Sequence, residues 1–294
     1  MTRMRAGCAR YDHCVSPLSH KSLSFPRLSS GARVPTNAPM TSTRYLDLSD
    51  GRSIAYRFTP GTGPVIVFLP GYMSDMAGSK AAALFEMARG SGLPCLLFDY
   101  SGCGESPGHF GEGTLTRWTQ EVLALVAALE TDEKIVLVGS SMGGWLMLMV
   151  AEALAGKVRG LIGVAPAPDF TDWGIAQMDK AMLADGEVVY EDNPYGPEPT
   201  PTHPGFWADG QANLLLDDTI AIDCPVRLLH GQRDAEVPYD IALQLAQRLR
   251  SADVQVTLIK DGDHRLSRAA DIHLLLGTVA QLVLPRAPED PSES

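Results

Sequence analysis

Six short apolar runs recur along this chain, each as long as a β-strand and none long enough to span a membrane as a helix. The runs do not alternate between apolar and polar residues, which is typical of strands that helices bury on both faces of a sheet. A hairpin signal at residues 49–51 comes before all of them. The runs begin at Val65, Cys95, Lys134, Leu161, Pro225 and Val254.

Segments with the apolar spacing of helices lie between or after these runs. The clearest covers residues 114–129, and others cover residues 141–154, 238–249 and 267–283. A hairpin followed by alternating buried strands and helices predicts an α/β fold, a mostly parallel sheet with helices on both faces. One domain over residues 41–285 accounts for the whole pattern.

The alternation fails once, after the sixth strand, in a segment that runs from residue 169 to about residue 217. This segment is rich in proline, acidic and aromatic residues, and a long interruption of a compact sheet is usually functional or mobile. We expect it to form a cap over a pocket, and a meandering surface loop is the alternative.

The two ends of the chain differ from the domain in composition, and we expect both to be disordered. Residues 1–40 carry six basic residues against one acidic residue, with many serines and no apolar run. An organelle transit peptide has this composition, and so does a mis-assigned start before Met40. The first interpretation predicts a mitochondrial protein, and the second predicts a bacterial, cytoplasmic one. Residues 286–294 are too polar and too rich in proline to pack.

Charge and cysteine content exclude several classes of function. The formal net charge of -11 argues against nucleic acid or an anionic membrane as a partner, because both would repel the protein. The five cysteines form no C-x-x-C pair, so neither a disulfide framework nor a thiolate metal site is indicated. The sequence has no H-E-x-x-H motif, and "SGCGESPG" at residues 101–108 lacks the marks of a nucleotide-binding loop. We therefore expect a soluble protein with no metal and no cofactor, in an oligomeric state that the pattern leaves open.

One glycine-rich turn has the spacing of a nucleophile elbow. Residues 139–143, "GSSMG", match G-x-S-x-G between a buried strand and a helix-forming run, which is the context that the motif requires. Because Gly139 and Gly143 have no side chains, they would avoid steric collisions in a tight turn, and the Ser141 hydroxyl would project from that turn. The alternative is a strand-to-helix turn with no chemistry.

A nucleophilic serine needs a base that takes its proton and an acid that orients the base. Among the seven histidines, only His264 combines a loop position, the end of a strand and the chain order Ser, Asp, His. His230 ends a buried strand, so we expect a structural role for it. Asp234 follows that same strand and is the preferred acid, and Asp169, which follows another strand, is the main alternative.

A tetrahedral intermediate also needs hydrogen-bond donors for its oxyanion. The backbone N–H of Met142, at the start of the expected helix, is one candidate. The second is the amide of Tyr72, because Gly71 permits a sharp turn directly after the run at residues 65–69. The alternative is that Gly71 serves the turn alone.

With these residues in place, the chain resembles the α/β-hydrolase superfamily over nearly all of residues 40–284. Five motifs narrow this resemblance to the mitochondrial palmitoyl-protein thioesterases, also described as mycophenolic acid acyl-glucuronide esterases, and their bacterial relatives. The motifs are "FLPGYMSDMAGSKA", "FDYSGCGES", "VGSSMGGWLML", "CPVRLLHGQRDAEVP" and "DHRLS".

The resemblance implies Ser141 as nucleophile, Asp234 as acid and His264 as base. It also implies cleavage of acyl thioesters or activated acyl esters, with a small molecule or an acylated protein as the substrate. The proline-rich segment that starts at residue 169 departs from the family pattern, and segments of this kind shape acyl and leaving-group pockets. A general carboxylesterase or a carbon-carbon bond hydrolase with the same triad is an alternative, and a non-catalytic binding protein on the same fold is another.

Overall fold

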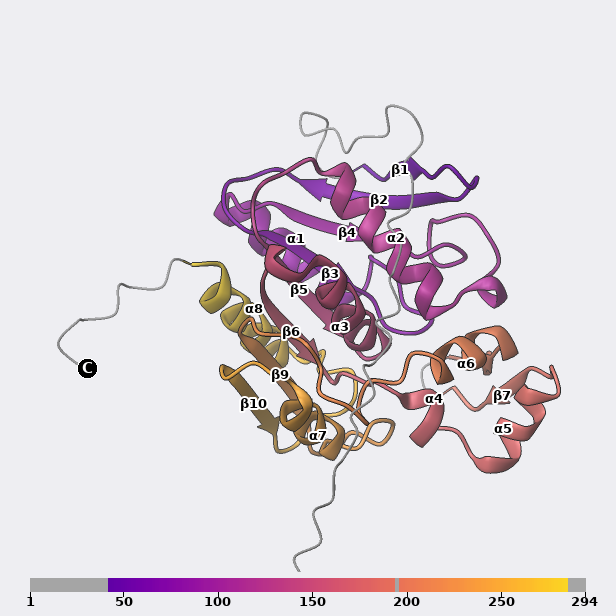
Figure 1. Ribbon diagram of the computed structural model, residues 1–294. Helices are drawn as coiled ribbons and strands as arrows, with labels where there is room; N and C mark the ends of the chain where they lie inside the picture. The colour runs from indigo at the N-terminus through magenta and orange to yellow at the C-terminus, as the bar shows by residue number, and fades with distance from the viewer. Residues whose placement is uncertain (1–41, 194–195, 285–294) are drawn as a thin grey trace, which may run out of the picture.

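The structure is a computed structural model that describes residues 42–193 and 196–284 (Figure 1). The predictions for the leader at residues 1–40 and for the tail at residues 286–294 lie outside the described residues. Within the two described ranges, no helix is long and apolar enough to cross a membrane.

In the described part of the chain, eight strands form one sheet in the order β1-β2-β4-β3-β5-β6-β9-β10. β1 and β2 form the predicted antiparallel hairpin, and Gly51 has a φ of 87° in the turn that joins them. All neighbouring strands from β4 to β10 are parallel, which confirms the mostly parallel sheet. The strands are β1 Arg44–Asp47, β2 Ser53–Thr59, β3 Val65–Leu69, β4 Cys95–Phe98, β5 Ile135–Ser140, β6 Val158–Val164, β9 Val226–Gly231 and β10 Val254–Ile259.

Helices cover both faces of this sheet, and each face has its own apolar core. Side chains alternate along β3, so that Val65, Val67 and Leu69 enter one core while Ile66 and Phe68 enter the other. Helices α2, α3 and α7 pack into the first core, and α1 and α8 pack into the second. The bounds are α1 Ser79–Ser91, α2 Leu115–Ala128, α3 Met142–Leu154, α7 Asp240–Arg248 and α8 Ala269–Val283.

Helix α2 shows why the predicted helical segments fold as expected. The Thr114 side chain accepts a hydrogen bond from the Arg117 N–H and caps the first turn. Leu115, Trp118 and Val122 then recur at helical spacing on the buried face. The predicted helix at residues 114–129 is confirmed to within one residue at each end.

Helix α1 is absent from the sequence-based predictions. Its buried residues Ala81, Leu84, Phe85 and Ala88 do have helical spacing. Two of the four are alanines, so the apolar signal is weaker than in α2. The chain must cross from β3 to the parallel strand β4, and a helix supplies that connection.

The segment at residues 169–217 follows β6, as expected, and it contains regular structure of its own. Figure 1 shows α4, α5, β7 and α6 grouped together outside the main sheet. β7 and β8 pair as an antiparallel two-stranded sheet. We call this part of the chain the inserted segment, and its elements are α4 Phe170–Trp173, α5 Gln177–Ala184, β7 Val189–Glu191, β8 Thr200–Thr202 and α6 Pro204–Gln211.

Asp169 ties the far end of the inserted segment to its beginning. The carboxylate of this buried residue accepts hydrogen bonds from the backbone N–H groups of Leu215, at 2.9 Å, and Leu216, at 2.7 Å. Both ends of the segment therefore lie close together where β6 ends, at the edge of the sheet that carries the candidate site.

Candidate active site

The turn between β5 and α3 consists of Ser141 alone, because β5 ends at Ser140 and α3 begins at Met142. Ser141 has φ 54° and ψ -121°, a strained conformation that favours display of its side chain at the end of the strand. A Cβ on Gly143 would lie 2.1 Å from the Leu69 carbonyl oxygen. A Cβ on Gly139 would lie 2.3 Å from the Gly143 carbonyl oxygen. Close backbone contacts therefore require glycine at both positions.

The structure brings together the three residues that the sequence predicts for a triad. Nε2 of His264 lies 3.0 Å from Oγ of Ser141, and its Nδ1 lies 2.8 Å from Oδ2 of Asp234. The three residues follow β5, β9 and β10, whose carboxyl ends meet at one edge of the parallel sheet. An ionised carboxylate only accepts hydrogen bonds, so Nδ1 carries the proton and Nε2 presents its lone pair to the serine hydroxyl.

Asp234 is held in place by four contacts and its side chain is fully buried. Oδ1 accepts hydrogen bonds from the backbone N–H groups of Glu236 and Val237, and Oδ2 lies within 3.2 Å of both His230 and His264. Burial alone would raise the pKa of Asp234, but the hydrogen bonds from His230 and His264 outweigh it and hold the pKa below the usual range. The carboxylate therefore stays ionised at neutral pH.

His230, for which the sequence predicts a structural role, contacts the carboxylate of Asp234. The ring is fully buried, and its Nε2 lies 3.0 Å from the Val237 carbonyl oxygen and 3.2 Å from Oδ2 of Asp234. Its Nδ1 has no hydrogen-bond partner within the described ranges. A neutral ring that carries its proton on Nε2 fits this environment, because that N–H donates and only the acceptor Nδ1 stays unpaired.

The loop after β3 passes directly beside Ser141. A Cβ on Gly71 would lie 3.4 Å from Cβ of Ser141, so the backbone directly before Tyr72 approaches the serine closely. Met142 is the first residue of α3, and its N–H is one of those that a helix leaves unpaired. Neither amide donates to an acceptor among the residues that the structure describes. Of the two amides that the sequence predicts as oxyanion donors, that of Met142 directly follows Ser141 in the chain, and that of Tyr72 belongs to the loop beside it.

The side chain of Tyr72 connects this loop to the inserted segment. Its hydroxyl donates a hydrogen bond to the Pro201 carbonyl oxygen at 2.8 Å. Its ring contacts Phe170 and Phe206 of the inserted segment and also Phe110, with ring centroids 4.9 to 6.1 Å apart. The backbone of Tyr72 thus belongs to the loop beside Ser141, while its side chain contacts the inserted segment.

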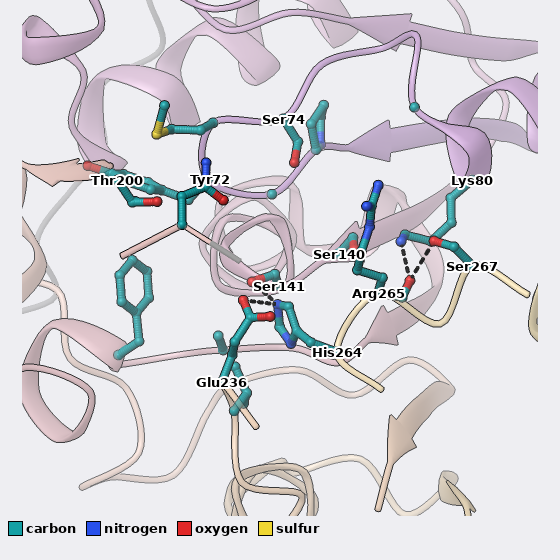
Figure 2. Close-up of a pocket in the computed structure, with 18 of the residues that line it drawn as sticks. Tyr72, Ser74, Lys80, Ser140, Ser141, Thr200, Glu236, His264, Arg265 and Ser267 are labelled. Atoms are coloured by element: carbon teal, nitrogen blue, oxygen red, sulfur yellow. Dashed lines mark hydrogen bonds and ion pairs between the residues drawn. The ribbon is translucent and has the colours of Figure 1, made fainter. Parts of the chain in front are cut away.

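Ser141 and His264 line a cavity of about 660 Å³ (Figure 2). The inserted segment supplies one part of the wall, with Phe170, Trp173 and Thr200. The inserted segment thus contributes side chains to the wall of this cavity.

Glu236 lies next to the site, and two basic residues that line the cavity were not identified from the sequence. Oε2 of Glu236 lies 3.8 Å from Nε2 of His264, and Lys80 and Arg265 line the same cavity. Lys80 and Arg265 are 185 positions apart in the chain, so no local motif links them.

Asp169, the alternative acid, is not among the residues that line the cavity. Its carboxylate faces the backbone of Leu215 and Leu216, as described above. Asp263, adjacent to His264 in sequence, accepts a hydrogen bond from the Leu266 N–H instead of reaching the imidazole. Asp234 is therefore the aspartate that contacts Nδ1 of His264.

Comparisons with known proteins identify the family to which the chain is similar. Residues 66–273 match the sequence profile of the Alpha/beta hydrolase family. The chain is 39% identical over 269 residues to the human protein "Palmitoyl-protein thioesterase ABHD10, mitochondrial", covering 86% of each chain. A putative hydrolase from Agrobacterium vitis S4 superimposes with a TM-score of 0.78 at 37% identity, over 84% of this chain and 100% of that one. The alpha/beta hydrolase domain-containing protein 10 from mouse superimposes with a TM-score of 0.77 at 37% identity, over 83% and 98%.

Proposed function

The chain belongs to the alpha/beta hydrolase family and is an ester-hydrolysing enzyme, and from that premise we propose that Ser141, His264 and Asp234 form its catalytic triad. The observation that carries the proposal is the chain of contacts from Oγ of Ser141 through the imidazole of His264 to Oδ2 of Asp234, at 3.0 and 2.8 Å. This arrangement has the geometry of a nucleophile, a general base and a group that orients the base.

In the proposed acylation step, His264 Nε2 takes the Ser141 proton while Oγ attacks the substrate carbonyl carbon. The carbonyl π bond opens and places negative charge on the oxygen, and the amides of Tyr72 and Met142 stabilise that charge. The tetrahedral intermediate then collapses and the bond to the leaving sulfur or oxygen breaks. His264 gives its proton to that atom, so a thiol or an alcohol departs and Ser141 stays acylated.

In the proposed deacylation step, water takes the place of the leaving group. His264 removes a proton from the water, whose oxygen attacks the acyl carbon. The resulting tetrahedral intermediate collapses, the bond from the acyl carbon to Oγ of Ser141 breaks, and His264 returns the proton to Oγ. The free acid is released and the enzyme is restored. Asp234 holds the imidazole in the tautomer that both steps need and stabilises the imidazolium, and its lowered pKa supports this assignment.

We propose acyl thioesters or activated acyl esters as the substrates, with the inserted segment at residues 169–217 acting as a cap that shapes the acyl pocket. The name of the human relative, a palmitoyl-protein thioesterase, supports thioesters as the substrate class. The aromatic wall formed by Tyr72, Phe170 and Trp173 supports an apolar acyl group, because burial of hydrocarbon against it is favourable. The substrate is then a small acylated molecule or an acylated protein.

The test is a panel of acyl chain lengths on thioester and oxygen-ester leaving groups, with the Ser141→Ala variant as the control. We expect Ser141-dependent turnover with thioesters or activated esters preferred. Faster turnover of aryl esters would favour a general carboxylesterase, and turnover of vinylogous diketones would favour a carbon-carbon bond hydrolase. Failure of the wild-type protein to react with a fluorophosphonate probe would instead favour a non-catalytic binding protein.

We propose a mitochondrial location if residues 1–40 act as a transit peptide, as the name of the human relative supports. The alternative is a bacterial, cytoplasmic protein. Mass spectrometry of the N-terminus of the protein purified from its native cells distinguishes the two.

A further inference from the structure

Two basic side chains line the cavity next to His264, in a chain whose formal net charge is -11. Lys80 stands in the first turn of α1, and Arg265 directly follows His264 in the chain. The Lys80 ammonium donates a hydrogen bond to the Arg265 carbonyl oxygen at 2.5 Å. Figure 2 shows both residues on the opposite side of Ser141 from Tyr72 and Thr200. The cavity therefore has a cationic end, and this end is remote from the part formed by the inserted segment.

The charges of Lys80 and Arg265 are close enough to repel each other. Burial, and then the charge of Arg265, lower the pKa of Lys80 to about 8. The acids that partly offset this effect are Asp263 and Asp271. Both carboxylates already accept other hydrogen bonds, Asp263 from the Leu266 N–H and Asp271 from the Arg268 side chain. An anion bound between Lys80 and Arg265 would relieve their repulsion.

The Lys80 ammonium also has donors to spare. An ammonium carries three N–H groups, and within the described ranges the Arg265 carbonyl oxygen is the hydrogen-bond acceptor for one of them. Lys80 is half-buried and lines the cavity, so a ligand in the cavity can reach the ammonium. The arrangement thus combines two positive charges with hydrogen-bond donors, which is what a carboxylate or phosphate group needs.

The position of His264 indicates which part of the substrate meets these charges. A general acid must lie within hydrogen-bond distance of the atom to which it gives its proton, so the leaving group must lie on the His264 side of the cavity. Lys80 and Arg265 are on that side, while Tyr72 of the aromatic wall lies on the other side of Ser141 (Figure 2). We propose that Lys80 and Arg265 bind an anionic group, a carboxylate or a phosphate, on the leaving group of the substrate. This inference rests on the proposed hydrolase function and adds a substrate preference to it.

Four acidic residues also line the cavity, and two of them lie in the inserted segment. Glu191 pairs with Thr200 in the inserted segment, and Asp192 follows it, so both lie at the aromatic end. Oδ1 of Asp75 accepts a hydrogen bond from the Ala77 N–H. Glu236 lies on the other side of the His264 ring from Arg265 (Figure 2). Glu191 and Asp192 disfavour an anionic acyl group at the aromatic end, so we expect the negative charge on the leaving group and not on the acyl chain.

The test compares three octanoyl thioesters that share the acyl chain and differ in the leaving thiol. The thiols are 3-mercaptopropionate, its neutral amide, and 2-mercaptoethyl phosphate. We expect kcat/KM at pH 7 to be about tenfold higher for at least one anionic thioester than for the neutral one, because charge-assisted hydrogen bonds form with it alone. Comparison of the carboxylate with the phosphate identifies the group that fits. The preference should shrink as salt is added, because salt screens the charges.

The variants Lys80→Gln and Arg265→Gln should each lower this anionic-to-neutral ratio severalfold. Lys260→Gln is the matched control, because Lys260 is an exposed lysine that does not line the cavity, and its ratio should equal that of the wild type. Lys80 also supports the backbone at Arg265, but a merely structural effect would lower kcat/KM for all three substrates equally and leave the ratio unaltered. An unaltered ratio in both variants, or no anionic preference in the wild type, overturns the inference.

Failure of the proposed function gives a different result, in which none of the three thioesters is turned over. In that case binding of the non-hydrolysable thioether analogue of the 3-mercaptopropionate substrate, measured by calorimetry, tests the cationic end by itself. The anion site is supported if Lys80→Gln and Arg265→Gln weaken binding relative to Lys260→Gln. It is overturned if neither variant changes the affinity.

Discussion

Asp234→Asn tests whether Asp234 orients the catalytic base. Asp169→Asn, for comparison, changes a residue that holds the inserted segment in place. An Asn at 234 can keep its carbonyl oxygen at the Oδ1 position, where the N–H groups of Glu236 and Val237 donate at 2.9 and 2.8 Å. Its NH₂ group then faces Nδ1 of His264, where Oδ2 lay at 2.8 Å. A donor in that place selects the tautomer with the proton on Nε2, so the lone pair that should accept the Ser141 proton is lost.

We expect Asp234→Asn to lower kcat by about 10⁴-fold, which corresponds to about 5 kcal/mol of transition-state stabilisation. Two of the four contacts survive, so the variant should still fold. Asp169→Asn should lower kcat by less than about tenfold and reduce the free energy of unfolding by about 1–3 kcal/mol, because an NH₂ group would meet the Leu215 N–H. The backbone tolerates Asn at 169, where φ is 61°.

The assay is steady-state hydrolysis of a palmitoyl or octanoyl thioester, combined with urea unfolding of the same protein samples. The argument is refuted if Asp169→Asn is the change that abolishes kcat, or if Asp234→Asn turns over at more than about a tenth of the wild-type rate while both proteins remain folded.

Ser141→Ala should lower kcat by about 10⁴-fold or more and abolish labelling by a fluorophosphonate, since only the oxyanion donors remain; retained activity would rule out the proposed nucleophile. Gly143→Ala should reduce the free energy of unfolding by about 3 kcal/mol, because its Cβ would lie 2.1 Å from a backbone oxygen, while Gly277→Ala, in an open part of helix α8, should raise it by about 0.5–1 kcal/mol; urea unfolding measures both. The kcat/KM preference for anionic leaving groups should fall as pH rises through about 8, where Lys80 loses its proton, and a preference that is constant from pH 7 to 9 would contradict the role of Lys80. The stability that Asp234 contributes should be fully present above pH 3.8, its ordinary pKa, and should be lost as the pH falls below that value, because its pKa is lower in the folded protein; acid titration of unfolding in wild type and Asp234→Asn measures it, and a stability gap that widens on acidification would contradict the sign.

The central sheet was predictable from the sequence because parallel strands that are buried on both faces need uninterrupted apolar runs. The order of Ser141, Asp234 and His264 was also predictable, since each follows a strand and parallel strands end at one edge of the sheet. Both features follow from local patterns in the sequence.

Other features depend on contacts between distant parts of the chain. The ends of the inserted segment are held by Asp169 and the amide of Leu215, which are 46 positions apart. The hydrogen bond between Lys80 and the Arg265 carbonyl oxygen spans 185 positions. His230 has the sequence context of any residue at the end of a buried strand, and only the fold places its ring against Asp234. Tertiary structure creates each of these juxtapositions, so no window of sequence contains them.

The proposed oxyanion role of Tyr72 would make the rate of the chemical step depend on the position of the inserted segment. The Tyr72 hydroxyl donates a hydrogen bond to the Pro201 carbonyl oxygen, and its backbone amide is the proposed donor to the carbonyl oxygen of the substrate. A long acyl chain that displaced the segment would pull on the phenol and so shift that amide. The length of the acyl chain would then alter kcat as well as the affinity for the substrate, so the enzyme would discriminate between acyl chains of different length in the chemical step itself.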